Sequence, residues 1–282
     1  MREAPRPNYD YDVNRVVKAY ERAVKDVHAE LNSLFLTDFE RAQIVAIEED
    51  MRGILTELKR YGNEWSSVAI TKSATNGVAA TLYALELTET YEEALAIAKF
   101  NGTNKRLVAT AIADTQADLL AMTQNIERQA KLAIRRATAE AMRSQLTQGI
   151  NGSRSLSSAI RKQITQATDV AILDSRNRRW KVGHYADMIA RTKMLEAHRE
   201  ASINEALAEE AYYGVISRHG ATDACRGYEG KIVKLVAGAP GDFEYIGDIP
   251  RNRLFHPACK HTVSALRDPS RTSVEIRGIN GI

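Results

Sequence analysis

The sequence has only two cysteines, Cys225 and Cys259, among its 282 residues. Two cysteines are too few for the disulfide framework of a small secreted protein, so a reducing compartment is the default expectation. A single disulfide between them would still fit the sequence. The N-terminus lacks the apolar run of a signal peptide, and no stretch approaches the roughly 18 uncharged apolar residues of a membrane span. We therefore expect no membrane partner.

Proline is absent between Pro7 and Pro240, and four of the six prolines lie in the last quarter of the chain. Because proline breaks helix interiors, this gap favours a largely helical first part. Apolar residues near the N-terminus recur at three- and four-residue spacing, as on one face of a helix. They are Val16, Val17, Tyr20, Val24, Val27 and Leu31.

Local signals predict where the helices begin and end. A capping box at Thr37–Glu40 predicts a helix that runs to Tyr61 and stops at Gly62. A second capping box, Thr90–Glu93, predicts a shorter helix that ends near Asn101-Gly102. Residues 103–148 contain neither glycine nor proline, which predicts one long helix.

The next segments are predicted to alternate between turns and helices. "GINGSRS" at 149–155 is a turn, with Ser155 capping a helix that runs to about Thr168. A loop around "DSRNRRWKVG" leads to a helix from roughly Tyr185 to Tyr212, which Gly214 closes.

After Gly214 the sequence is typical of short strands. "GVISRHG", "GKIVKLV", "EYIGDI" and "HTVSAL" are β-prone runs separated by glycine, proline and aspartate. The predicted fold is therefore mainly α with a small C-terminal α+β module. We divide the chain into three parts: a helical N-terminal region (1–130), a C-terminal module (131–268) and an extended or poorly ordered tail (269–282). The module consists of helices at 131–212 and a β-rich part at 214–268.

Positive charge is concentrated in the middle of the chain. Residues 131–181 carry 11 lysines and arginines against 3 acidic residues, a net charge of +8, although the whole chain carries only +3. Such a segment attracts an anionic partner such as double-stranded DNA. A solvated helix face and loop explain the same charge equally well. The candidate DNA-binding residues are Arg176, Arg178, Arg179 and Lys181.

Both cysteines and half of the histidines lie within the β-rich part. Thiolate and imidazole are the ligands that Zn²⁺ prefers in structural sites, and a module this small gains folding energy from a metal. The spacing is unusual, because Tyr228 stands where a C-x₂-C knuckle would have its second cysteine. The candidate ligands are Cys225, His256, Cys259 and His261, with His219 as a spare or alternative fourth ligand.

Other interpretations of these residues remain open at the level of the sequence. The histidines could be satisfied by backbone carbonyls, with Cys259 as a small buried hydrophobe. A metal-dependent nuclease would need defined roles for carboxylates or a His–Asn pair, and nothing in the sequence fixes such roles for Asp223, Glu229 or Asn252. Cys259 and His261 could also form a nucleophile pair. We expect no enzymatic activity.

The segment from about Ile134 to Leu266 resembles the head-morphogenesis (minor head) proteins of tailed bacteriophages, the family that includes the F protein of phage Mu. The resemblance rests on five features in order, and "SRHGATDACRGYEGKIV" is also similar to related phage minor capsid proteins. The features are a helix, the turn "GINGSRS", the Arg191-Thr192 helix "IARTKMLEAHREASINEAL", the loop "DACRGYEGKIV" with Asp223, Cys225, Gly230 and Lys231, and the signature "HPACKH" with His256, Pro257, Cys259 and His261.

This resemblance implies a structural virion protein that acts in procapsid assembly at or near the portal. Its partners would be the portal, scaffold or major capsid protein, and packaged DNA is a further candidate. Many family members have a second loop cysteine and end the signature in cysteine, where this chain has Tyr228 and His261. A metal site here would therefore have mixed cysteine and histidine ligands. The alternatives are a metal-dependent nuclease or toxin-like enzyme, and a DNA-binding adaptor without a capsid role.

Structural roles are also expected for several residues of the signature. Arg191 and Thr192 should hold their helix against the small module. Gly230 should form a tight turn, and Lys231 should begin the next strand.

Overall fold

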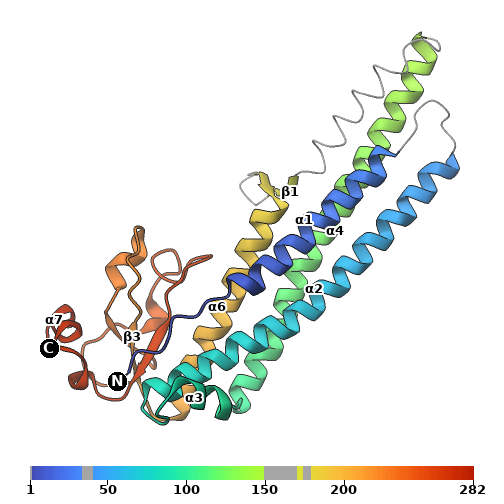
Figure 1. The fold of residues 1–282 in the computed structure, drawn as a ribbon. Helices are drawn as coiled ribbons and strands as arrows, with labels where there is room; N and C mark the ends of the chain where they lie inside the picture. Colours follow the sequence, from blue (N-terminus) through green and yellow to red (C-terminus); the bar gives the residue numbers. More distant parts are fainter. Residues whose placement is uncertain (1, 34–40, 149–169, 174–178) are drawn as a thin grey trace. The chain divides into compact units, whose positions relative to one another are not determined.

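The structure is a computed structural model that describes residues 2–33, 41–148, 170–173 and 179–282 (Figure 1). The chain forms two compact units, which are described separately below. The helical unit comprises Asp12–Trp65 and Gln116–Asp187. The mixed unit comprises Met1–Tyr11, Ser66–Thr115 and Met188–Ile282. The prediction of a mainly α chain with a small C-terminal β-rich module is confirmed.

In the helical unit, α1 (Asp10–Asn32) buries the apolar face that the spacing predicts. Val16 and Val27 are fully buried, whereas Val17, at the border of this face, is only half-buried. The Tyr20 hydroxyl donates a hydrogen bond to the carbonyl oxygen of Leu119 at 2.8 Å, and burial raises the pKa of Tyr20 to about 12. Its hydrogen bond lets the ring fill the core without leaving a polar group unpaired.

Helix α2 (Arg41–Ala84) continues through Gly62, so the prediction that a helix stops there is wrong. A Cβ at Gly62 would lie 3.5 Å from Cδ1 of Leu119 and 3.7 Å from the hydroxyl oxygen of Tyr20. The glycine therefore lies against packed neighbours, where continued burial outweighs the penalty of about 1 kcal/mol for glycine in a helix. The capping box predicted at Thr37–Glu40 lies outside the described residues.

The second predicted capping box is confirmed. Thr90 accepts a hydrogen bond from the backbone N–H of Glu93, and the Glu93 carboxylate accepts from the backbone N–H of Thr90. The helix that they cap, α3, is short (Tyr91–Ile97). Helix α4 (Gly102–Gln148) is unbroken, as predicted for 103–148. The turn predicted at 149–155 and the helix predicted from Ser155 lie outside the described residues.

The loop predicted before the last long helix contains an antiparallel pair that the sequence did not suggest. Strand β1 (Val170–Leu173) pairs with β2 (Arg179–Lys181). Helix α6 (Val182–Ala208) follows directly. It ends before the predicted residue, because Glu210 takes up the left-handed conformation (φ 57°) that was expected of Gly214.

Gly214 instead lies in β3 (Tyr213–Ile216), so its predicted role as a helix cap is wrong. Strand β3 is the central strand of a three-stranded antiparallel sheet, between β4 (Ile232–Lys234) and β5 (Val263–Leu266). A Cβ at Gly214 would lie 2.3 Å from Cγ1 of Val263. Any other residue here would force the buried Val263 side chain to shift.

Two further predictions for the C-terminal part are wrong. "EYIGDI" forms a short 3₁₀ helix, Ile246–Asp248, after an isolated bridge between Tyr245 and Lys234, and not a strand. Residues 269–282 are not extended, because they form a 3₁₀ turn and then α7 (Val274–Asn280) (Figure 1). Asn280 accepts a hydrogen bond from the backbone N–H of Ile232 at 2.8 Å, which fastens α7 to the start of β4.

Candidate metal centre

Three segments of the mixed unit bring the candidate ligands together. His219 lies in the loop after β3, and Cys225 lies in a 3₁₀ helix, η2 (Ala224–Tyr228). His256, Cys259 and His261 lie in the turn that leads into β5. The turn with His256 lies about thirty residues after Cys225 in the sequence, and the sheet brings it to the same end of the module as the other two segments.

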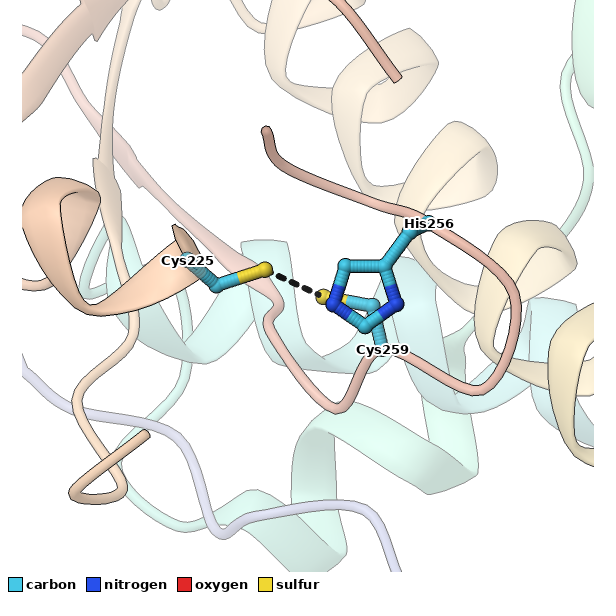
Figure 2. A group of neighbouring side chains, drawn as sticks. All are labelled: Cys225, His256 and Cys259. Carbon is cyan, nitrogen blue, oxygen red and sulfur yellow. Dashed lines mark hydrogen bonds between the residues drawn. The ribbon is translucent and has the colours of Figure 1, made fainter. Parts of the chain in front are cut away.

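The two cysteine sulfurs face each other in the interior of the module. Their Sγ atoms are 3.6 Å apart, and both thiols are free and buried (Figure 2). The His256 ring lies beside them, with a ring nitrogen within 4.8 Å of both sulfurs (Figure 2). Burial, and then the contact with Cys259, raise the pKa of Cys225 to about 12. In the absence of a cation, this thiol is therefore neutral at physiological pH.

One carboxylate orders both Cys225 and His256. Oδ1 of Asp223 accepts a hydrogen bond from the backbone N–H of Cys225 at 3.0 Å, which caps η2. Oδ2 of Asp223 lies 3.1 Å from Nε2 of His256. The other ring nitrogen of His256, Nδ1, lies 2.9 Å from the carbonyl oxygen of Pro257.

The turn that carries His256 has an unusual backbone. Phe255 and Ala258 both have positive φ, at 61° and 60°, although neither is glycine. Such conformations are strained for L-residues and persist only where the surroundings hold them. Thr192 of α6 contributes, because its hydroxyl accepts a hydrogen bond from the backbone N–H of Ala258 at 2.8 Å. The guanidinium of Arg199, also on α6, lies 4.0 Å over the Phe255 ring.

His261 is almost completely buried, with an exposed fraction of 1%. Its Nδ1 lies 3.2 Å from Sγ of Cys259 and 3.3 Å from Nε2 of His219. Its Nε2 lies 3.5 Å from Oε1 of Glu229 but forms no hydrogen bond. Burial, and then the neighbouring His219, lower the pKa of His261, while Glu229 opposes the shift.

Glu229 holds the loop that contains His219. Its Oε1 accepts hydrogen bonds from the backbone N–H groups of His219 at 2.7 Å and of Ala221 at 3.0 Å. Burial alone would raise the pKa of Glu229, but these backbone donors outweigh it and lower the pKa to about 2. A charged carboxylate is thus fixed beside His261. The sequence offered no signal for this role, since Glu229 is one of 36 acidic residues.

The family model for phage minor capsid protein 2 matches residues 39–266, which is most of the chain and includes all five candidate ligands. The chain belongs to this family. It is therefore a structural phage protein of the virion that assembles with other head components. The predicted relationship to phage head-morphogenesis proteins is confirmed at this level, whereas the likeness to the F protein of phage Mu stays a prediction.

The other comparisons add no relative of this minor capsid protein. Neither the curated proteins nor the solved structures give a significant match. Among the described residues, no helix combines the length and the apolar character needed to cross a membrane.

The predicted DNA-binding residues of the minor capsid protein lie around β2 and before it. Arg176 and Arg178 lie outside the described residues, and Arg179 is placed in β2 by its backbone alone. Lys181 is exposed at the end of β2. On α4 of the same unit, Arg135 and Arg136 are also exposed, so the basic character of residues 131–181 extends to the described surface.

The remaining signature residues lie around the module. Arg191 forms an ion pair with Asp10 at 2.6 Å, which ties α6 to the start of α1. Gly230 has a φ of 78° and forms the turn before β4. Lys231 precedes that strand, with its Nζ 5.0 Å from the ring centroid of Tyr228. The tyrosine that replaces the expected second cysteine is itself buried.

Proposed function

We propose that this minor capsid protein acts in procapsid assembly at or near the portal vertex, by binding the portal protein of its phage. The observation that carries the proposal is the family match over residues 39–266. The exposed faces of long helices such as α2 and α4 suit a protein that lies along a partner. Scaffold and major capsid proteins are the other head components that it would meet during assembly.

Co-expression with the head proteins of the same phage tests this function. We expect a tagged chain to co-purify with the portal protein, both in the full set of head proteins and with the portal protein alone. The matched control is the portal protein passed over the same resin without the tagged chain. Binding to the major capsid protein alone, with no enrichment of the portal protein, would contradict portal association and would place the chain elsewhere in the head.

We further propose that the basic segment 131–181 contacts packaged double-stranded DNA. Its net charge of +8 supports this, as do the exposed side chains of Arg135, Arg136 and Lys181. Cationic side chains that neutralise phosphates release counterions, so binding of this kind weakens steeply as salt rises.

Replacing Arg176, Arg178, Arg179 and Lys181 together by alanine should flatten that salt dependence. Each lost phosphate contact lowers the slope of log K against log salt by about 1, so we expect a decrease of up to about 4. Filter binding to duplex DNA over a range of salt concentrations measures the slope.

The control removes the same charge elsewhere, by changing Lys59, Lys99, Lys105 and Arg106 to alanine, all of which are exposed. An equal loss of slope in both variants would mean that net charge, and not this segment, governs binding. An unchanged slope in the first variant would exclude its four residues as phosphate contacts.

A further inference from the structure

We propose that the C-terminal module of this minor capsid protein binds one Zn²⁺ ion, and that the ion joins η2 to the turn before β5. The ligands are Cys225, His256 and Cys259, whose ligand atoms all lie within 4.8 Å of one another, together with His261. His261 groups in the same way with His219 and Glu229, and its Nδ1 reaches the first three residues through Sγ of Cys259 at 3.2 Å. The proposal rests on the spacing of the sulfurs, on the neighbours of the two histidines and on the backbone of the turn.

The separation of the two sulfurs fits a shared zinc ion better than it fits a disulfide. With Zn–S bonds of about 2.3 Å and tetrahedral angles, two thiolates on one zinc ion lie about 3.8 Å apart. The observed separation of Cys225 and Cys259 is 3.6 Å. A disulfide would require the sulfurs to approach by about 1.5 Å, to the bond length of about 2.05 Å.

Both histidines have the surroundings of zinc ligands. Histidines that bind a metal usually present their other ring nitrogen to a carboxylate, which fixes the ring and its tautomer. Nε2 of His256 lies 3.1 Å from Asp223, and Nε2 of His261 lies 3.5 Å from Glu229. In His261 this leaves Nδ1 for the metal, whereas Nδ1 of His256 lies 2.9 Å from the carbonyl oxygen of Pro257 and would exchange that contact for the ion. Nδ1 of His261 already lies 3.2 Å from Sγ of Cys259, close to the separation of about 3.6 Å expected for sulfur and nitrogen on one zinc ion.

His219 and Glu229 are assigned to the surroundings of the ion and not to its ligands. Glu229 accepts two backbone hydrogen bonds through Oε1, and these hold the loop in place. Nε2 of His219 reaches Nδ1 of His261 at 3.3 Å. It therefore occupies the nitrogen that the zinc ion would take, and it would turn away when the ion binds.

The local fold explains what a metal would contribute. The connection between β4 and β5 contains only one short 3₁₀ helix among its described elements. It includes two strained residues, Phe255 and Ala258, on either side of His256-Pro257. Ile249 and Leu254 of this connection are buried in the core of the module, and ligand bonds across the turn that follows would add order to the strained backbone there.

Metal analysis of the full-length chain, purified without chelators, gives the first test. We expect about one zinc ion per chain, and we expect protein loaded with Co²⁺ to show tetrahedral ligand-field absorption with thiolate-to-cobalt charge transfer. Zinc should also protect both cysteines from alkylation, and removal by a chelator should restore their reactivity. Failure to retain zinc or to give the Co²⁺ spectrum would overturn the proposal, as would an intact-mass decrease of two hydrogens, which marks a disulfide.

Variants then test the assignment of ligands. Substitution of a residue that only orients a metal ligand typically weakens metal binding by about 10- to 100-fold, and we expect a loss in this range for Asp223→Asn. Cys259→Ser and His261→Ala each remove a ligand and should weaken zinc binding by more than that. His219→Ala should keep full binding, as should His184→Ala at an exposed position of α6. If His219→Ala loses zinc while His261→Ala retains it, the ligand set is wrong.

Two measurements separate loss of a ligand from loss of the fold. Helical content by circular dichroism reports on α2, α4 and α6, which should survive in every variant. For a variant that does not keep its helices, the alkylation experiment on the wild-type chain decides the question, because it needs no substitution. Neither measurement involves the portal protein. The zinc proposal can therefore fail while the proposed assembly role stands, and the reverse.

Discussion

Replacing Gly77 by alanine is expected to lower the free energy of unfolding by about 3 kcal/mol, the upper end of the usual range for overpacked cores. Gly77 lies on α2 where that helix meets α6. A Cβ there would lie 2.1 Å from the carbonyl oxygen of His198 and 2.9 Å from its carbonyl carbon. These are backbone atoms of α6, so they cannot rotate away as a side chain would. The two helices would have to separate.

The separation would break neighbouring contacts as well. One turn further along both helices, the Thr81 hydroxyl donates to the backbone oxygen of Ser202 at 2.9 Å and lies 2.7 Å from its hydroxyl oxygen. Both side chains are buried. Hydrogen bonds of this length do not survive a shift of an ångström, and a buried hydroxyl that loses its partner adds a further penalty. The cost of the extra methyl group therefore includes these contacts.

Gly53 on the same helix provides the matched control. A Cβ at Gly53 would meet nothing within 4 Å, and the position is exposed. Gly53→Ala should therefore stabilise the chain by about 0.5–1 kcal/mol through helix propensity alone. Urea denaturation followed by circular dichroism measures both changes. If the two substitutions shift stability equally, the close approach of α2 and α6 at Gly77 is refuted.

The glycines also illustrate which parts of the fold the sequence could predict. Gly230 was expected to form a tight turn, and its φ of 78° agrees. Gly62 and Gly214 were expected to end helices, but one lies inside α2 and the other inside β3. The sequence identifies a glycine, but whether it serves a turn or a close approach depends on residues such as Leu119 and Val263, which are distant in the chain.

Elements determined by near neighbours were predicted well. The capping box at Thr90 needs only residues within one turn, and the uninterrupted α4 needs only the absence of helix breakers. Helix α7 was missed because its place depends on contacts with distant parts of the chain. Ile276 is buried in a cluster with Val215 and Ile232, more than forty residues earlier in the sequence.

The candidate metal centre could also be predicted only in part. Cysteine and histidine are rare in this chain, so their concentration in one module was visible in the sequence. The direction of each ring was not, because Asp223 and Glu229 orient the histidines through loops that the sheet brings together. Both carboxylates were noted near the candidate ligands in the sequence, but acidic residues are abundant and nothing in the sequence assigned these two to the histidines.

Acidification from about pH 6.5 to pH 4 is expected to lower the free energy of unfolding by about 3 kcal/mol through His198 alone. Burial, and then the neighbouring Arg199, lower the pKa of His198 to about 4, against about 6.5 in the unfolded chain. Between these values the unfolded state binds the proton and the folded state does not, so stability falls as the pH falls. Each unit of pKa difference is worth about 1.4 kcal/mol, and the contribution is complete above about pH 6.5.

The variant His198→Gln isolates the contribution of His198 to this pH dependence, because glutamine stays neutral at every pH. In the wild type the Tyr9 hydroxyl oxygen lies 2.9 Å from Nδ1 of His198, and glutamine can still form a hydrogen bond there. Many carboxylates titrate in the same range, so the decisive quantity is the difference in unfolding free energy between variant and wild type at each pH. That difference should shift by about 3 kcal/mol in favour of the variant between pH 6.5 and pH 4. His184→Gln, at an exposed position on the same helix, should leave the profile unchanged. Parallel profiles for His198→Gln and wild type would mean that His198 accepts its proton without unfolding. The pKa of His198 would then not be lowered in the folded chain, and its burial would not contribute to acid destabilisation.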